Sequence, residues 1–169
     1  QLRTIAASVL FRLGVPWPDA EDRARLAFQQ ADTHLPLPEL IRPLGDVGGL
    51  LSSLHSAGVR VAVVTTDHRA ETVQTLQLME IAHLVDHIVC GDDGPPSKPA
   101  PDMLLAACQE SGVEPRRTAV VGDTVADLLM AQRAGAGFKA AVLTGAGDPE
   151  ELRARADTVL ASIVEVAVE

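Results

Sequence analysis

The chain has 169 residues, of which 47% are hydrophobic and 22% are charged, a composition that suits one compact domain with a small appendage. Its formal net charge of -9 argues against nucleic-acid or anionic-membrane partners, and no apolar run approaches the ~20 residues of a membrane span. The two cysteines, Cys90 and Cys108, lie in dissimilar surroundings and indicate neither a disulfide framework nor a zinc site, so we expect a reducing, cytoplasmic compartment.

The N-terminal part is expected to be helical. Residues 2–13 and 20–31 carry apolar side chains at helical spacing, which predicts two amphipathic helices. Prolines interrupt the pattern at residues 36–43 and indicate a linker. We therefore place a domain boundary between residues 1–38 and 39–169. The chain starts at Gln1 and shows no signal peptide, so we expect it to begin inside a longer or processed protein.

A regular alternation of helices and strands follows the linker. Asp46 is typical of a helix N-cap and Gly58 of the end of that helix. Strands are expected at residues 60–66, 84–90, 118–121, 138–143 and 158–160, and helices at 68–80, 101–112, 122–134 and 148–155. This alternation predicts an α/β fold, with a Rossmann-like, mostly parallel sheet covered by helices on both faces.

Polar residues gather where these strands end. Thr65 and Thr66 follow the first strand, Lys98 comes shortly after the second, and Asp123 follows the third, with Asp127 four residues further on. Ligands of such sheets bind outside the carboxyl ends of the strands, so we expect these side chains to converge on one rim.

This set of side chains suits a phosphoryl group. Thr65 can donate a hydrogen bond to a phosphate oxygen, helped by backbone N–H groups at the start of the next helix, and Lys98 supplies a positive charge. Asp123 can bind Mg²⁺, a cation that prefers oxygen ligands. Asp127 can orient Asp123 or a water bound to the metal.

These segments resemble the haloacid dehalogenase superfamily. The sequences VAVVTTD, SKPAPDM and VVGDTVAD match its second, third and fourth motifs in order, spacing and strand context. The prolines around Lys98 resemble the branch of phosphoglycolate phosphatase and β-phosphoglucomutase, and the first two helices resemble the remnant of that branch's helical cap. The resemblance implies Mg²⁺-dependent hydrolysis of a small phosphorylated metabolite through an aspartyl-phosphate. It assigns catalysis to Thr65 and Lys98, substrate binding to Thr65, Thr66 and Lys98, and the metal to Asp123 and Asp127.

The resemblance implies a first motif, Asp-x-Asp-x-Thr after an apolar strand, that carries the nucleophilic and the acid–base aspartate, and this motif is missing from the chain. No Asp-x-Asp occurs anywhere in the 169 residues, and Asp19-Ala-Glu21 sits in a polar helix start with no strand before it. The resemblance implies that this motif follows a strand lying centrally, between the strands that end at Thr65 and at Asp123. We therefore expect a gap in the middle of the sheet, a weak or absent Mg²⁺ site, and no phosphatase turnover by this chain alone. A further segment or chain could supply the missing strand.

Several other interpretations remain open at this point. Asp123 alone could be a helix N-cap, Thr66 the start of a helix, and Lys98 a solvated surface residue. The fold could serve a non-catalytic pseudo-enzyme or phosphate-binding module, or the chain could be a truncated form whose missing part exists elsewhere. A mutase or a dehalogenase of the same superfamily is a further alternative, although dehalogenase chemistry needs no metal and the two aspartates argue against it.

Overall fold

The computed structural model describes residues 10, 13–34 and 41–167. The chain divides into two compact units, Gln1–Ile41 and Arg42–Glu169. In the first unit, helix α2 (Trp17–His34) confirms the helix expected at residues 20–31, and Ala20 and Ala24 on it are buried against Leu10 and Val15. The helix expected at residues 2–13 and the proline-rich linker lie mostly outside the described residues.

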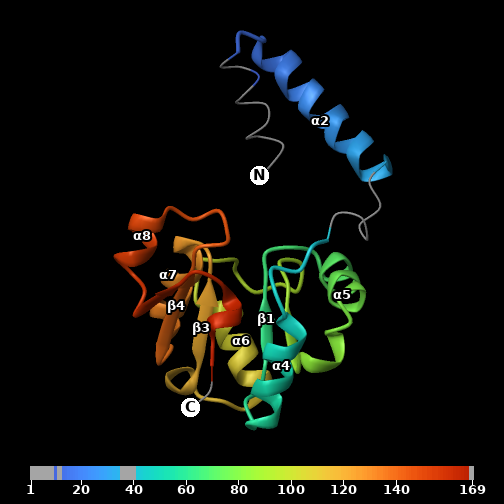
Figure 1. Ribbon diagram of the computed structural model, residues 1–169. Coiled ribbons are helices and arrows are strands. Elements are labelled where there is room, and N and C mark those ends of the chain that lie inside the picture. The colour runs from blue at the N-terminus through green and yellow to red at the C-terminus, as the bar shows by residue number, and fades with distance from the viewer. Residues whose placement is uncertain (1–9, 11–12, 35–40, 168–169) are drawn as a thin grey trace. The chain divides into compact units, whose positions relative to one another are not determined.

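The second unit has the expected alternation (Figure 1). Its helices are α4 (Val47–Ser56), α5 (Arg69–Leu78), α6 (Asp102–Ser111), α7 (Val125–Ala134) and α8 (Pro149–Arg153), and its strands are β1 (Ala62–Val64), β2 (His87–Val89), β3 (Ala119–Gly122), β4 (Phe138–Val142) and β5 (Thr158–Leu160). Short 3₁₀ turns complete it at Ala82–Leu84, Pro115–Arg117 and Ile163–Glu165.

Local signals account for where several helices begin and end. The Asp46 carboxylate accepts a hydrogen bond from the backbone N–H of Gly49 and so caps α4, as expected. Helices α6 and α7 end at Gly112 and Gly135, whose left-handed φ angles of 63° and 76° are costly for other residues.

The strands are all parallel but form two separate sheets. Strand β1 pairs with β2, and β3, β4 and β5 form the second sheet in that order. Within the described residues, β1 and β3 therefore each pair on one side only. Direct pairing between β1 and β3 would have contradicted the expected gap, and it is not seen.

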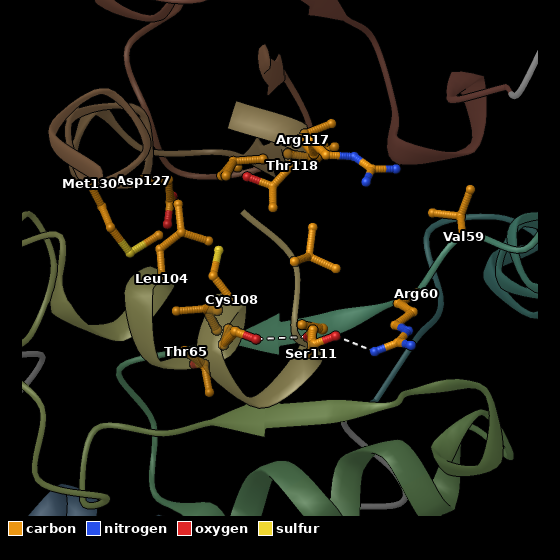
Figure 2. A pocket seen from close by; sticks show the side chains of 18 of the residues that line it. Val59, Arg60, Thr65, Leu104, Cys108, Ser111, Arg117, Thr118, Asp127 and Met130 are labelled. Carbon is orange, nitrogen blue, oxygen red and sulfur yellow. Dashed lines mark hydrogen bonds between the residues drawn. The ribbon is translucent and has the colours of Figure 1, made fainter. Parts of the chain in front are cut away.

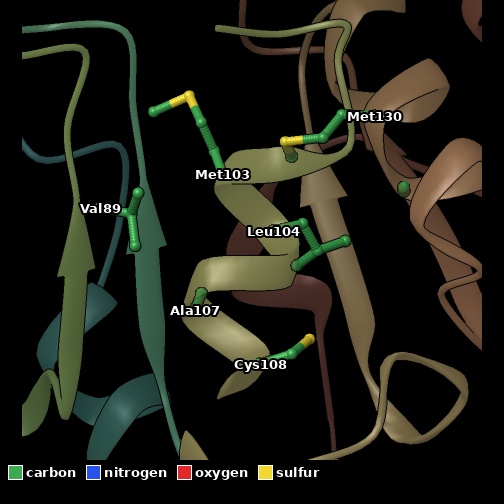
Figure 3. Close-up of a cluster of buried hydrophobic side chains, with 7 residues drawn as sticks. Val89, Met103, Leu104, Ala107, Cys108 and Met130 are labelled. Carbon is green, nitrogen blue, oxygen red and sulfur yellow. The ribbon is translucent and has the colours of Figure 1, made fainter. Parts of the chain in front are cut away.

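Helices cover both faces of the first sheet. On one face of the first sheet, Leu51 of α4 and Leu76 of α5 pack with Val63 and Ile88. On the other face, α6 packs against both strands, and α6 also contacts α7, which covers the second sheet. Figure 3 shows this arrangement, with Leu104 and Cys108 on α6 between Val89 and Met130. A third cluster joins Leu128, Ala141 and Leu152 between α7, β4 and α8. None of the helices among the described residues combines the length and hydropathy needed to cross a membrane.

Candidate active site

A cavity of ≈ 790 Å³ lies between β1 and β3. Thr65, Lys98, Asp123 and Asp127 all line it, although they come from four different segments of the chain. In Figure 2, Thr65 and Asp127 lie toward one end of the cavity, and Val59 and Arg60 lie toward the other. The structure thus brings together four of the five residues predicted from the sequence, at the carboxyl ends of the two edge strands.

Lys98 forms an ion pair with Asp127 in this cavity. The ammonium Nζ lies 2.7 Å from Oδ1 of Asp127, and the two side chains are only 14% and 9% exposed. Lys98 lies in the loop that joins β2 to α6, and its peptide bond to Pro99 is cis. The next segment is held in place by Arg133 of α7, which donates a hydrogen bond to the Pro99 carbonyl. The solvated-surface interpretation of Lys98 is therefore wrong.

Asp127 also caps helix α7. Its Oδ2 accepts hydrogen bonds from the backbone N–H and the hydroxyl of Thr124, at 3.0 and 2.6 Å, and the Thr124 side chain accepts one from the backbone N–H of Asp127. This reciprocal pair is a capping box with Thr124 at the N-cap. The alternative in which Asp123 caps this helix is therefore wrong.

The electrostatics of Asp127 reflect these contacts. Burial disfavours its ionised form, but the hydrogen bonds from Lys98 and Thr124 and the charge of Lys98 outweigh burial, so the pKa of Asp127 lies below its ordinary value. The carboxylate stays ionised at neutral pH. Because both of its oxygens already have partners, the structure favours a positioning role for Asp127 over direct metal ligation.

Asp123 is held by the loop after β4. Its Oδ2 accepts a hydrogen bond from the backbone N–H of Ala146, and its carbonyl accepts one from Gly147. A Cβ atom at Gly145 would collide with the Asp123 side chain, so only glycine permits this approach. In the same way, a Cβ atom at Gly122 would collide with the side chain of Asp127. The sequence did not predict these close approaches, since glycine next to a strand end also indicates an ordinary turn.

Thr65 and Thr66 differ in their positions. The Thr65 hydroxyl lies in the cavity lining, donates a hydrogen bond to Asp67 and accepts one from the backbone N–H of that residue. Thr66 is exposed, does not line this cavity and precedes α5, which begins at Arg69. A phosphate contact by Thr66 stays a prediction.

A network missed at the sequence level ties the loop after β1 to the loop after β2. Arg69 donates two hydrogen bonds to the carboxylate of Asp93, at 2.6 and 2.7 Å, and a third to the carbonyl of Ile88. Its backbone N–H donates to Asp92. The bond to Asp93 and the negative charges nearby raise the pKa of Arg69, and the same bond lowers the pKa of Asp93. The two acids therefore fix the relative position of two rim loops.

The residues of the rim fit a magnesium ion only in part. Mg²⁺ in phosphoryl-transfer sites is held by one or two carboxylates together with waters and substrate oxygens. Asp123 offers a carboxylate that no cation neutralises in the described contacts, whereas Asp127 is paired with Lys98. No group of three or more His, Cys, Asp or Glu side chains suited to a metal occurs among the residues that the structure describes. The residues that the structure describes thus supply one clear ligand.

The amino-acid sequence of this chain is similar to those of known phosphatases. A family model described as a haloacid dehalogenase-like hydrolase matches residues 10–135. A phosphoglycolate phosphatase from Nitrosospira multiformis is 36% identical over 85 residues, which cover 50% of this chain and 37% of the relative. An N-acetylmuramic acid 6-phosphate phosphatase from Pseudomonas aeruginosa is 30% identical over 141 residues, covering 83% of this chain and 61% of the relative.

Solved structures share the fold. A haloacid dehalogenase-like family hydrolase from Streptococcus pneumoniae superposes with a TM-score of 0.75 at 22% identity, over 95% of this chain and 73% of that one. The chain spans about half the length of the curated relatives it matches.

Proposed function

The chain belongs to the haloacid dehalogenase-like hydrolase family, and we propose that it forms the phosphoryl-binding part of a phosphatase-type active site. The observation that carries the proposal is the convergence of Thr65, Lys98, Asp123 and Asp127 on one cavity at the carboxyl ends of β1 and β3. A hydroxyl, an ammonium and a carboxylate at one such edge suit the binding of a phosphate group.

Each side chain has a separate role in this proposal. Thr65 turns its hydroxyl from Asp67 to a phosphoryl oxygen, and Lys98 holds a positive charge beside that oxygen. Asp127 fixes the position of the Lys98 ammonium, and Asp123 binds Mg²⁺. When bound, Mg²⁺ would supply positive charge that offsets the negative charge of the phosphoryl oxygens.

The proposed substrate is a phosphate monoester of a small metabolite. Two of the relatives are named as phosphatases of phosphoglycolate and of N-acetylmuramic acid 6-phosphate, and a third, from Halalkalibacterium halodurans, is named as a pyrophosphatase. A mutase is the second candidate, because a structural relative from Thermotoga maritima is titled a putative β-phosphoglucomutase. Both candidates bind the phosphoryl group in the same way, so the test below addresses what they share.

We further propose that the chain by itself does not turn over substrate. No Asp-x-Asp occurs in its 169 residues, so the nucleophile and the acid–base group that the family resemblance implies must come from outside them. Mg²⁺-dependent hydrolysis of p-nitrophenyl phosphate by the purified chain, abolished by Asp123→Ala, would overturn this part.

Phosphate binding tests the site without requiring turnover. Inorganic phosphate is titrated calorimetrically into the chain with and without Mg²⁺. Charge-assisted hydrogen bonds contribute about 1.5–3 kcal/mol, so Lys98→Met should weaken binding by about ten- to a hundredfold, since each 1.4 kcal/mol is tenfold. Thr65→Val should weaken it by less.

The matched control is Lys139→Met, which removes a lysine of β4 that is paired with Asp157 and does not line the cavity. It should leave phosphate binding unchanged. Equal affinities for the parent chain, Lys98→Met and Thr65→Val would show that the rim is not a phosphate site.

A further inference from the structure

The loops that follow β1 and β2 run side by side at the rim. The backbone N–H of Thr65 donates a hydrogen bond of 2.9 Å to the carbonyl of Val89, which continues the pairing of the two strands by one step. Two residues later, the carbonyl of Asp67 accepts a hydrogen bond of 2.9 Å from the backbone N–H of Gly91. The first loop is therefore held against the second after it has left the sheet.

Gly91 makes this approach possible. A Cβ atom at this position would collide with the carbonyl oxygen of Thr66. Because that oxygen belongs to the backbone, the collision could be relieved only by moving one of the two loops. The path of the second loop thus limits where Thr66 and its neighbours can lie.

Arg69 closes the contact between the loops. Its Nε and Nη2 atoms donate hydrogen bonds of 2.7 and 2.6 Å to the two carboxylate oxygens of Asp93, and Nη2 also donates to the carbonyl of Ile88. Its backbone N–H donates to the carboxylate of Asp92 at 2.9 Å. Asp93 is itself fixed, since its Oδ2 accepts a hydrogen bond of 2.6 Å from the backbone N–H of Cys90. These contacts of Arg69 and Asp93 form a loop clamp that ties the first turn of α5 to the end of β2 and to the loop after it.

The loop clamp reaches the oxygen of the Thr65 side chain through Asp67. The Asp67 N–H donates a hydrogen bond of 3.1 Å to Oγ1 of Thr65, while the Asp67 carbonyl is held by Gly91. When the Thr65 hydroxyl turns its proton from the Asp67 carboxylate toward a phosphoryl oxygen, the N–H of Asp67 still holds Oγ1 in place. The position of Oγ1 thus depends on the position of Asp67, two residues before Arg69.

We propose that Arg69 is a positioning residue which, with Asp93, sets the place of the Thr65 hydroxyl for binding a phosphoryl group. This inference rests on the proposed function, because it assigns Arg69 a task at the same phosphate site. Arg69 does not line the cavity, and its guanidinium is held by Asp93, so it acts through Thr65 rather than on the ligand. A hydroxyl that is already held in place loses less conformational freedom when the ligand binds, and the affinity is higher for that reason.

The charge of Arg69 offers a competing explanation that two substitutions separate from positioning. Asp93→Asn removes a negative charge from the rim, so an effect of charge alone predicts tighter phosphate binding. The same substitution takes away one of the two acceptors of Arg69, so the loop clamp loosens and the positioning role predicts weaker binding. Arg69→Lys keeps the positive charge but cannot form two parallel hydrogen bonds with one carboxylate. Charge alone therefore predicts parent affinity for Arg69→Lys, whereas positioning predicts a loss.

Calorimetric titration of inorganic phosphate in the presence of Mg²⁺ measures these effects. A neutral hydrogen bond changes a binding constant by about two- to tenfold, and Arg69→Met can lose no more than Thr65→Val loses. Arg69→Met and Asp93→Asn should therefore bind phosphate about two- to tenfold more weakly, with Arg69→Lys between them and the parent chain. The matched control is Arg116→Met, which removes an exposed arginine paired with Glu114 in the turn before β3 and should leave binding unchanged.

A double-mutant cycle shows whether Arg69 acts through Thr65. In a chain that already carries Thr65→Val, the hydroxyl is gone, so adding Arg69→Met should cause no further loss of phosphate affinity. A general loosening of the rim would instead displace Lys98 and Asp123 as well. It would weaken binding by the same factor with and without the Thr65 hydroxyl.

Amide hydrogen exchange followed by NMR tests the loop clamp without any ligand. In Arg69→Met, the amide of Gly91 should exchange about fivefold faster, the factor expected for an ion pair partly open to solvent. The amide of Gly147, which donates to Asp123 at the rim of the second sheet, should keep its parent rate. Circular dichroism checks that each variant folds, and Arg69→Lys and Asp93→Asn take the place of Arg69→Met if that variant does not.

The outcomes separate this inference from the proposed function. Weaker binding in Arg69→Met and Asp93→Asn, with faster exchange at Gly91, supports the positioning role if the loss disappears once Thr65 is valine. Parent affinity in both variants, tighter binding in Asp93→Asn, or an equal loss in the Thr65→Val chain overturns it. The proposed function then still stands on Lys98→Met and Thr65→Val. If phosphate affinity depends on neither Lys98 nor Thr65, the proposed function fails and the positioning role fails with it, while the exchange rate at Gly91 still decides whether the loop clamp exists.

Discussion

Removing the Lys98 ammonium should destabilise the second unit substantially. In Lys98→Met, the Asp127 carboxylate stays 9% exposed but loses its cation. Breaking a buried ion pair by removing one partner costs about 3–5 kcal/mol. Asp127 keeps two hydrogen bonds from Thr124, so we expect the lower end, about 3 kcal/mol. With a urea slope of about 2 kcal/mol per molar, the unfolding midpoint should fall by about 1.5 M.

Far-UV circular dichroism is the suitable probe for this experiment. The only tryptophan of the chain, Trp17, lies in the first unit, so its fluorescence would report the wrong part of the molecule. The control is Lys139→Met. Lys139 is 18% exposed, but its partner Asp157 is 41% exposed and so remains hydrated when the lysine is removed, and pairs open to solvent contribute about 0–1 kcal/mol. Equal midpoints for the parent chain and Lys98→Met would refute the view that the pair is a buried structural contact.

Three further predictions follow from the rim. Thr124→Ala should lower the free energy of unfolding by about 1 kcal/mol through loss of the cap, and Thr124→Ser should restore most of it; a variant at parent stability would contradict the capping role. Gly145→Ala should lower the free energy of unfolding by about 1–3 kcal/mol, because the new Cβ displaces the Asp123 side chain. In the control Gly48→Ala the nearest atom to the new Cβ, on Ile81, is 3.8 Å away, so urea unfolding should show a neutral or stabilising effect. The pKa of Asp127 is lowered in the folded state, so its ionised carboxylate contributes to the free energy of unfolding. This contribution is complete above the ordinary pKa of 3.8 and is lost as the pH falls through the lowered pKa. Urea midpoints of the parent chain and Lys98→Met should therefore converge in that acidic range, and a constant difference would contradict the assignment.

Local signals made most of the second unit predictable. The Asp46 cap and the glycines at positions 112 and 135 depend on residues a few positions apart, so they can be read from the sequence. The strands are shorter than their apolar runs, since the run at residues 60–66 yields only Ala62–Val64. A strand is defined by pairing, and β1 has a partner on one side only within the described residues.

The sequence predicted four of the residues that line the cavity rim, but it did not predict the contacts between them. Strand-end positions identified Thr65, Lys98, Asp123 and Asp127, because parallel strands bring their carboxyl ends together. The ion pair between Lys98 and Asp127 joins residues 29 positions apart and depends on how the loop before α6 folds back on α7. The Thr124 capping box, in contrast, is a local pattern that can be read from the sequence, because Thr124 and Asp127 are three residues apart.

The charge balance of the rim explains why phosphate binding should depend on Mg²⁺. Lys98 is already neutralised by Asp127, so Asp123 leaves the cavity rim with a net negative charge, and Asp67 beside Thr65 adds to it. A phosphate monoester brings further negative charge, which such a rim repels until a divalent cation binds. Phosphate and Mg²⁺ must then raise each other's affinity by the same factor, because coupling between two ligands is reciprocal.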